Sequence, residues 1–184
     1  MLIDYLGELE PNETKLYIEV VTSPSSVKLF DLLYKEDWEW NRRKIEEYIL
    51  PSVKLLIEEF EEDGTKLANR LIKIMKSYAG LNPRRKDGYF GDIAFYTYQI
   101  LYEIAVRRDK ENVEKFLDLL ETLLKKYIIG NKVKRGVALE VLKDINAFIR
   151  DYERLEKEDP DRYYEIIKSG EFKRKLSETL EHYS

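Results

Sequence analysis

Apolar residues recur at steps of three and four along almost the whole chain from residue 24 onward. Val113, Phe116, Leu117, Leu120 and Leu124, for example, would form one continuous stripe along a helix. This spacing is typical of amphipathic helices that pack one face against a core. Residues 16–21 could form a short strand or a helix, and a helix is favoured because no partner strand is found elsewhere. The sequence therefore predicts an all-α fold.

Local signals mark where the helices begin and end. Ser23-Pro24 and Asp159-Pro160 each place a capping side chain before a proline, which is favourable at the first helical position. Ser169-Gly170 predicts a break within the last helical stretch. Glu153–Asp159 is interpreted as a charged linker, and Pro51 predicts a kink. The predicted helices are one that begins at Pro24 and those at 39–61, 65–79, 91–107, 112–129, 135–152 and 160–183.

The segment 91–107 differs from the others because it is apolar on two opposite faces. Ile93, Thr97, Ile100 and Ile104 lie on one face, and Phe95, Tyr98, Tyr102 and Val106 lie on the other. A helix that is apolar all round is normally buried. We therefore expect neighbouring helices to cover both faces.

The 184 residues are long enough for one domain with a sizeable core. No Gly/Ser linker or low-complexity segment divides the chain. The sequence predicts a single domain with an N-terminal helical cap (1–40), a helix-pair core (41–152) and a C-terminal helical cap (153–184).

Composition excludes several classes of site. The chain has no cysteine, so it cannot hold a disulfide, a thiolate metal site or a cysteine nucleophile. Charged residues make up 37% of the chain, against an ordinary figure of about 25%, which is typical of hyperthermophile proteins. The expected source is archaeal and the expected location cytoplasmic. No apolar run is long enough to cross a membrane and the N-terminus lacks a signal peptide pattern, so no membrane partner is expected.

Two basic loops, Asn82–Gly88 and Asn131–Gly136, stand out in an otherwise acidic chain. If the helices run up and down, alternate turns emerge on the same edge, and the two loops would be neighbours. Cations beside aromatic rings suit phosphate contacts and stacking on bases. The alternative is that these cations only neutralise helix C-termini, each contributing about 0.3–1 kcal/mol. The candidate nucleic-acid or anionic-partner residues are Arg84, Arg85, Lys86, Tyr89, Phe90, Lys132, Lys134 and Arg135.

Two other features suggest protein partners. The turns at 61–65 and 152–161 are rich in Asp and Glu and would emerge on the edge opposite the basic loops. Such polarity would suit head-to-tail self-association or docking beside another subunit, although charge runs are usually only solvated surface. Trp38 and Trp40 are two residues apart on a helix, so one is expected to be exposed as a partner anchor. Core packing is the alternative for both.

No catalytic motif accompanies these features. The only histidine, His182, lies three residues from the end, and its seven-residue separation from Arg174 does not match the HEPN ribonuclease signature. Phosphate-binding glycine loops are absent. Asp87 and Asp92 could hold a hard cation, but their spacing matches no calcium loop. The sequence predicts no catalytic residue, no metal site and no cofactor.

Helix pairs joined by short turns resemble HEAT or armadillo-type repeats over roughly residues 44–150. The best match is residues 116–149, where a leucine-rich helix is followed by Asn131, Val133, Arg135, Ala138 and Leu142 in the family's order. The turn at 80–90 departs from the pattern because it is several residues too long. The resemblance implies a curved helical stack that binds partners. An irregular up-and-down bundle would generate similar periodicities.

From these features we expect a non-enzymatic interaction module, an adaptor or complex subunit that docks through charge-polarised edges. The alternative is a nucleic-acid-binding accessory protein that grips phosphate with the two basic loops. A protein partner is expected in the first case and RNA or DNA in the second.

Overall fold

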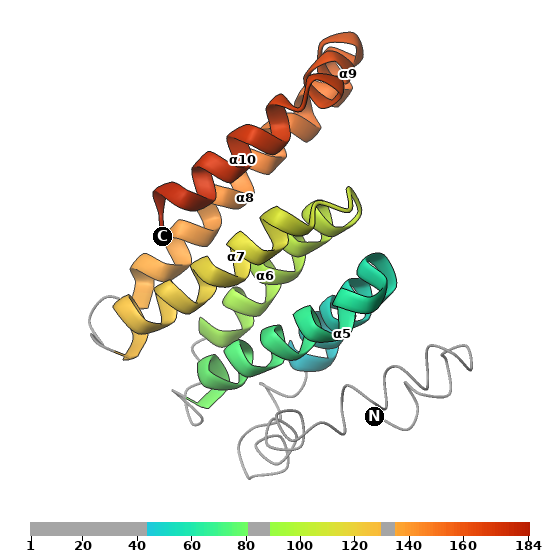
Figure 1. Cartoon of the computed structure of the whole chain (residues 1–184). Helices are drawn as coiled ribbons and strands as arrows, with labels where there is room; N and C mark the ends of the chain where they lie inside the picture. The colour runs from blue at the N-terminus through green and yellow to red at the C-terminus, as the bar shows by residue number, and fades with distance from the viewer. Residues whose placement is uncertain (1–43, 81–88, 130–134) are drawn as a thin grey trace. The chain divides into compact units, whose positions relative to one another are not determined.

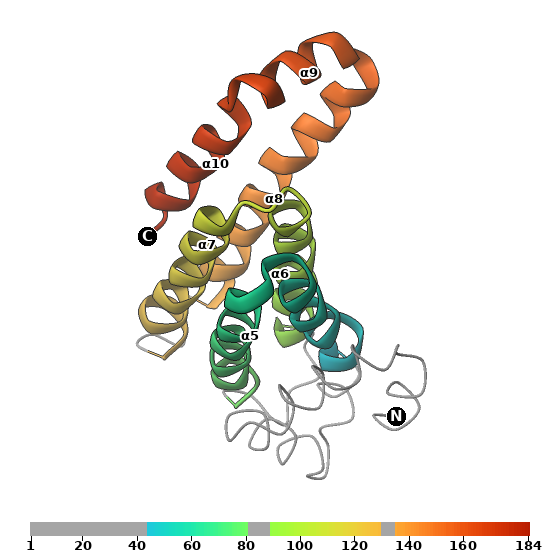
Figure 2. The same ribbon diagram turned by 45° about the vertical axis from the view of Figure 1, so that its right-hand side comes forward.

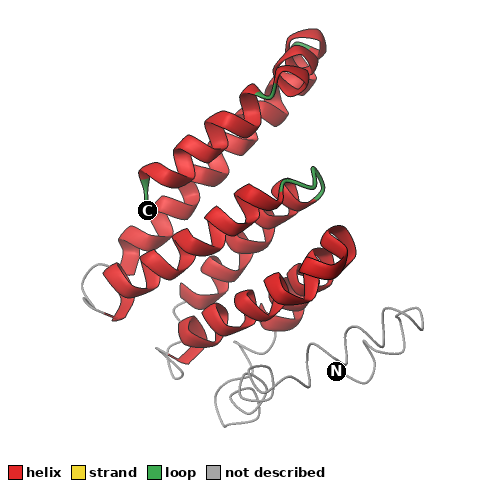
Figure 3. Ribbon diagram, in the orientation of Figure 1, coloured by secondary structure: helices red, strands yellow, loops and turns green. Residues whose placement is uncertain are grey.

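The computed structural model describes residues 44–80, 89–129 and 135–184. Every element within these ranges is a helix, which confirms the all-α fold (Figure 3). The chain divides into two compact units, residues 1–86 and 87–184, with the boundary inside the predicted 80–90 loop. The predicted N-terminal and C-terminal caps have other boundaries, which fall between residues 40 and 41 and between residues 152 and 153. Each unit is described here by itself.

In unit 1, a π-helical turn, η1 (Ile45–Ile49), leads into α5 (Leu50–Gly80). The π turn directly precedes Pro51, whose missing N–H removes one helical hydrogen bond at the place where a kink is expected. At Glu61 the backbone leaves the helical region (φ 48°, ψ −115°), and the chain doubles back (Figure 1). The described part of the predicted helix 39–61 therefore corresponds to η1 and the first arm of α5, and the predicted helix 65–79 corresponds to the second arm.

Gly64 allows the arms of α5 to approach closely. A Cβ atom at this position would lie 2.5 Å from the carbonyl oxygen of Leu56 and 2.7 Å from the Cα of Ile57. Both atoms belong to the backbone of the other arm and cannot rotate away. The core between the arms is apolar and includes Val53, Leu71 and Met75. Only a residue without a side chain fits at this crossing.

Unit 2 contains five α-helices and one further π turn in its described part. Helix α6 packs against α7 and α8, while α10 packs against α7, α8 and α9 (Figures 1 and 2). The elements are α6 (Tyr89–Ala105), α7 (Lys110–Leu123), η2 (Leu124–Ile129), α8 (Arg135–Glu158), α9 (Pro160–Ser169) and α10 (Glu171–His182).

The signals at the start and end of α9 act as the sequence predicts. The Asp159 side chain accepts a hydrogen bond from the backbone N–H of Arg162, and Pro160 occupies the first turn. Gly170 ends α9 with φ of +78°, a left-handed conformation that favours glycine, and α10 begins at the next residue. The predicted break at Ser169-Gly170 is confirmed.

Two predictions about unit 2 are wrong. The segment 153–158 is not a linker, because α8 continues through Glu158. No glycine or proline interrupts it before Pro160, and ion pairs such as Arg154–Asp151 (3.6 Å) support the added turns. Helix α6 is also not covered on both faces. Ile93, Ile100 and Ile104 are buried, but Tyr102 and Val106 are 45% and 41% exposed.

Several predictions concern residues outside the described part of the chain. These are the conformation of residues 1–22, the helix that begins at Pro24, and the exposure of Trp38 and Trp40. Among the described helices, none combines the length and apolar character needed to cross a bilayer.

Candidate functional site

Most of the predicted binding residues fall outside the part of the chain that the structure describes. Arg84, Arg85, Lys86, Lys132 and Lys134 belong to this group, so their expected proximity stays a prediction. Tyr89 and Arg135 are the first residues of α6 and α8, and their side chains are likewise outside the description. Phe90 is described, and its side chain is only 7% exposed. Its ring therefore packs inside the protein and does not present a surface for base stacking.

A cluster of polar side chains joins α6, α8 and α9 in unit 2. Arg107 donates to the Glu103 carboxylate at 2.9 Å and to the Tyr163 hydroxyl at 3.4 Å. Arg150 donates to Glu103 at 3.4 Å. Arg150 also contacts Glu153, and it donates to the Gln99 side chain at 2.9 Å. We call these six residues the α6–α8–α9 cluster.

The pKa values of the two carboxyl groups in this cluster are shifted in opposite directions. Burial raises the pKa of Glu103, and its hydrogen bond to Glu153 raises it further against the opposing effect of Arg107. The pKa of Glu153 is lowered, because its hydrogen bonds to Glu103 and Arg150 outweigh its own desolvation. The pKa values of the two carboxyl groups are therefore shifted apart. The Arg107 guanidinium stays charged: burial opposes this, but the hydrogen bonds to Glu103 and Tyr163 raise its pKa.

Aromatic rings lie beneath the cluster. The Arg107 guanidinium sits 4.8 Å from the centroid of the Phe172 ring, a cation–π arrangement. Phe172 in turn contacts Tyr152 edge-on at 4.8 Å and stacks against Phe148 at 6.1 Å. These contacts connect α10 to α8 under the same arginine. Arg107 is thus the point where α6, α9 and α10 meet.

Paired carboxylates with separated pKa values can serve as a general acid and base. In this cluster, however, both carboxylates are held by arginines, and the side chain of Glu103 is only 11% exposed. The arrangement instead fixes the position of α9 relative to the body of unit 2.

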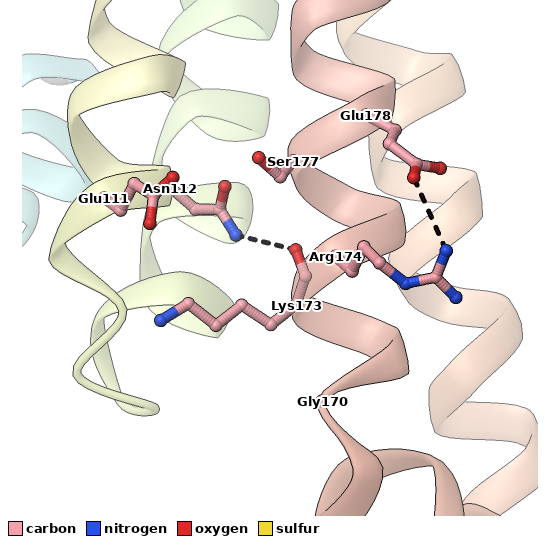
Figure 4. Close-up of a pocket in the computed structure, with 7 residues that line it drawn as sticks. All are labelled: Glu111, Asn112, Gly170, Lys173, Arg174, Ser177 and Glu178. Atoms are coloured by element: carbon pink, nitrogen blue, oxygen red, sulfur yellow. Dashed lines mark hydrogen bonds and ion pairs between the residues drawn. The ribbon is translucent and has the colours of Figure 1, made fainter.

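A second polar site lies between α7 and α10, which run in the same direction (Figure 4). Asn112 is 1% exposed, and its amide nitrogen donates to Asp109 at 2.6 Å and to the Lys173 carbonyl at 3.1 Å. Its amide oxygen has no hydrogen-bond partner. The site forms a shallow pocket of about 290 Å³ lined by Glu111, Asn112, Gly170, Lys173, Arg174, Ser177 and Glu178.

Ser177 and Lys115 beside this pocket contain the elements of a serine–lysine nucleophile pair. The Lys115 ammonium donates to the Ser177 hydroxyl and also contacts Glu181 at 2.7 Å and Glu111 at 3.1 Å. The hydrogen bonds to Glu181 and Glu111 raise the pKa of Lys115. A lysine that acts as a general base needs a lowered pKa, so this pair is not built to activate the serine. The pocket also mixes acidic and basic side chains and selects no one ligand charge.

The most exposed large hydrophobic residue in the described ranges, Tyr164, lies on α9. Helix α9 is amphipathic but has no buried residue. Tyr164 is 71% exposed and Ile167 is 37% exposed. Exposed charged residues lie on and beside α9, and the acidic ones (Glu156, Glu158, Asp159, Asp161 and Glu165) outnumber the basic ones (Lys157, Arg162 and Lys168). Figures 1 and 2 show α9 at the outer end of α8 and α10. We call α9 and the end of α8 the tip.

Among the residues that the structure describes, no group of three or more His, Asp or Glu side chains is arranged to hold a metal ion. Asp92 lies in the first turn of α6, and Asp87 is outside the described residues. Comparisons with protein-family models, curated proteins and solved structures return no match to this chain. Function is therefore inferred from the chain's own geometry.

Proposed function

We propose that this chain is a non-enzymatic interaction module, an adaptor or complex subunit that docks onto a protein partner through the tip. The observation that carries the proposal is Tyr164, which is 71% exposed on a helix with no buried residue. Exposed aromatic residues are common energetic anchors of protein interfaces. Tyr163 and Ile166 of the same helix are half-buried, whereas Tyr164 extends into solvent, where a bound partner would cover it.

The firm attachment of α9 supports the same role. Arg107 contacts Tyr163 on the inner face of α9, and the Asp159 cap and Gly170 define the two ends of the helix. A surface that is already ordered before binding loses less conformational entropy when the complex forms. The α6–α8–α9 cluster would therefore serve binding by holding Tyr164 in a fixed orientation.

A capture experiment tests this function. The full chain, a Tyr164→Glu variant and a Val137→Glu control would each be used as bait in extract from the source cells. Val137 is a suitable control because it is 40% exposed on α8, away from the tip. We expect a protein that the wild type and the control capture and Tyr164→Glu loses, and the purified partner should reproduce this difference. Equal capture by all three baits would contradict the proposal.

The second candidate function is nucleic-acid binding through Arg84–Lys86 and Lys132–Arg135. The observation in its favour is the concentration of cations in two short segments of an acidic chain. The segments follow the ends of α5 and η2, where capping also accounts for part of the charge. Fluorescence anisotropy with labelled RNA and DNA at ~50 and ~200 mM salt separates these explanations, since phosphate contacts weaken steeply with salt. The Arg84→Glu/Arg135→Glu double variant should abolish any true binding.

The resemblance to HEAT-type repeats would fit the leading proposal, because such stacks bind partners along their helices. In the matched segment 116–149, α7 and η2 supply the first helix and α8 the second. Whether unit 2 belongs to that family stays a prediction.

A further inference from the structure

We propose that the partner covering the tip is a second copy of this chain, with the two α9 helices packed antiparallel about a twofold axis near Tyr164. This inference rests on the proposed function, because it names the occupant of the same surface. Its basis is the arrangement of charges on the exposed face of α9.

Three residues form one stripe along this face. Asp161, Tyr164 and Lys168 follow one another at steps of three and four, so they lie on the same side of the helix. All three are exposed. Neither Asp161 nor Lys168 makes an ion pair with a residue that the structure describes. The stripe thus carries an acid at one end, an aromatic ring in the middle and a base at the other end.

Such a stripe is complementary to itself. When two identical helices pack antiparallel about an axis midway between Asp161 and Lys168, the acid of each copy faces the base of the other. The midpoint falls between Tyr164 and Glu165, so the two tyrosine rings meet near the centre with the two Glu165 carboxylates beside them. Ile167 lies beside this centre and adds apolar area. The resulting contact has the tyrosine rings near its middle and two reciprocal ion pairs at its ends.

The size and charge of the tip determine how strong the contact should be. One face of a short helix buries less than the roughly 1,200 Å² typical of a stable complex, so we expect a weak dimer that forms in a concentration-dependent way.

The surrounding acidic residues of two tips repel each other. At ~150 mM salt this longer-range repulsion is largely screened, whereas close ion pairs are less affected. Dimerisation should therefore be stronger at ~150 mM than at ~20 mM salt.

Sedimentation equilibrium of the full chain, from ~10 µM to ~1 mM, tests the proposal through a charge exchange. In Asp161→Lys, the introduced lysine of each copy faces Lys168 of the other copy. The dissociation constant of the dimer should therefore rise at least fivefold. The double variant Asp161→Lys/Lys168→Asp restores the opposite pairing and should return the dissociation constant to within about twofold of wild type. Tyr164→Ala should also weaken the dimer at least fivefold. Lys125→Asp, at an exposed position of η2, is the control and should leave it unchanged.

Three outcomes would overturn the proposal: a monomer at every concentration, a dimer that Asp161→Lys and Tyr164→Ala leave unchanged, or failure of the double variant to restore pairing. Circular dichroism of each variant checks that it remains folded. Failure here is distinguishable from failure of the proposed function. A monomeric chain whose partner capture still depends on Tyr164 would refute self-pairing and leave the interaction module in place.

Discussion

At the scale of single residues, the feature with the clearest consequence is the unequal titration of Glu103 and Glu153. Burial raises the pKa of Glu103, whereas hydrogen bonds lower that of Glu153. A raised carboxyl pKa contributes stability that is complete below the ordinary value of 4.5 and is lost as pH rises through the folded value. A lowered pKa contributes stability that is present above 4.5 and is lost as pH falls through the folded value.

Substituting each carboxyl by an amide should therefore give opposite pH dependences. The difference in melting temperature, Glu103→Gln minus wild type, should become more positive as pH rises above 4.5, since only the wild type must ionise a buried group. The same difference for Glu153→Gln should become more negative as pH rises toward 4.5 and then level off. Thermal melts at half-unit pH steps from about 3 to 8 measure both. Parallel slopes for the two variants would contradict this account.

Gly64 gives a second prediction at this scale. Gly64→Ala should destabilise unit 1 by about 1–3 kcal/mol, because its methyl group would press on the backbone of Leu56 and Ile57. Gly136→Ala is a matched control. Gly136 is the second residue of α8 and has no atom within 4 Å of an added Cβ, so this change should leave stability unchanged or raise it by up to about 1 kcal/mol. Urea unfolding of both variants supplies the two free energies, and similar values at both sites would disprove the close approach of the arms.

At the scale of helices, the sequence predicts elements well where a residue dictates backbone conformation. Pro160 and Gly170 mark the start and end of α9 because one lacks an N–H and the other tolerates positive φ. The charged residues 153–158 carry no such constraint. Charge alone does not end a helix, and for this reason the predicted linker was wrong. The exposure of Tyr102 could not be predicted for a different reason. Periodicity identifies an apolar face but does not show whether a neighbouring helix covers it.

The candidate sites were less predictable than the helices. Arg107 and Tyr163 are 56 positions apart, and Lys115 and Ser177 are 62 apart. Neither pair matches a local motif, and only the packing of the helices brings them together. Sequence reasoning concentrated on loops with unusual charge. It identified the acidic residues of 152–161, although most of that segment is helix and not a turn, and it gave no indication that Tyr164 would be the most exposed large apolar residue described.

Arg107 offers a prediction at the helix scale because it connects three helices. Arg107→Ala should destabilise unit 2 by about 1–3 kcal/mol, since it leaves the Glu103 carboxyl without its closest cation and removes the contacts to Tyr163 and Phe172. Arg154→Ala is the control. The side chains of Arg154 and its partner Asp151 are 67% and 68% exposed, so the loss should stay below about 0.5 kcal/mol. Denaturant unfolding measures both, and equal effects would argue against a structural role for the cluster.

At the scale of the whole molecule, the chain divides into two compact units. Each unit contains its own buried residues: Leu56 and Leu71 in unit 1, Phe116 and Leu142 in unit 2. The boundary between Lys86 and Asp87 coincides with the loop whose length departs from the repeat pattern. A core inside each unit implies that each can unfold by its own transition.

We therefore expect a fragment of residues 87–184 to fold without the rest of the chain. Its far-ultraviolet circular dichroism should be strongly helical, and its melt should be cooperative, because its core residues come from its own helices. Arg107→Ala should lower the unfolding free energy of the fragment by as much as it lowers that of unit 2 in the full chain. A fragment with no cooperative melt would mean that residues 1–86 complete its core.

The boundary after residue 86 also determines which part of the protein tryptophan fluorescence reports on. Both tryptophans, Trp38 and Trp40, belong to unit 1, and unit 2 contains none. Indole emission excited near 295 nm therefore follows unit 1 alone, whereas the circular dichroism of the full chain sums both units. A single temperature ramp recorded by both probes needs no added label. Curves that separate would indicate two independent transitions, and curves that superimpose would indicate that the units melt together.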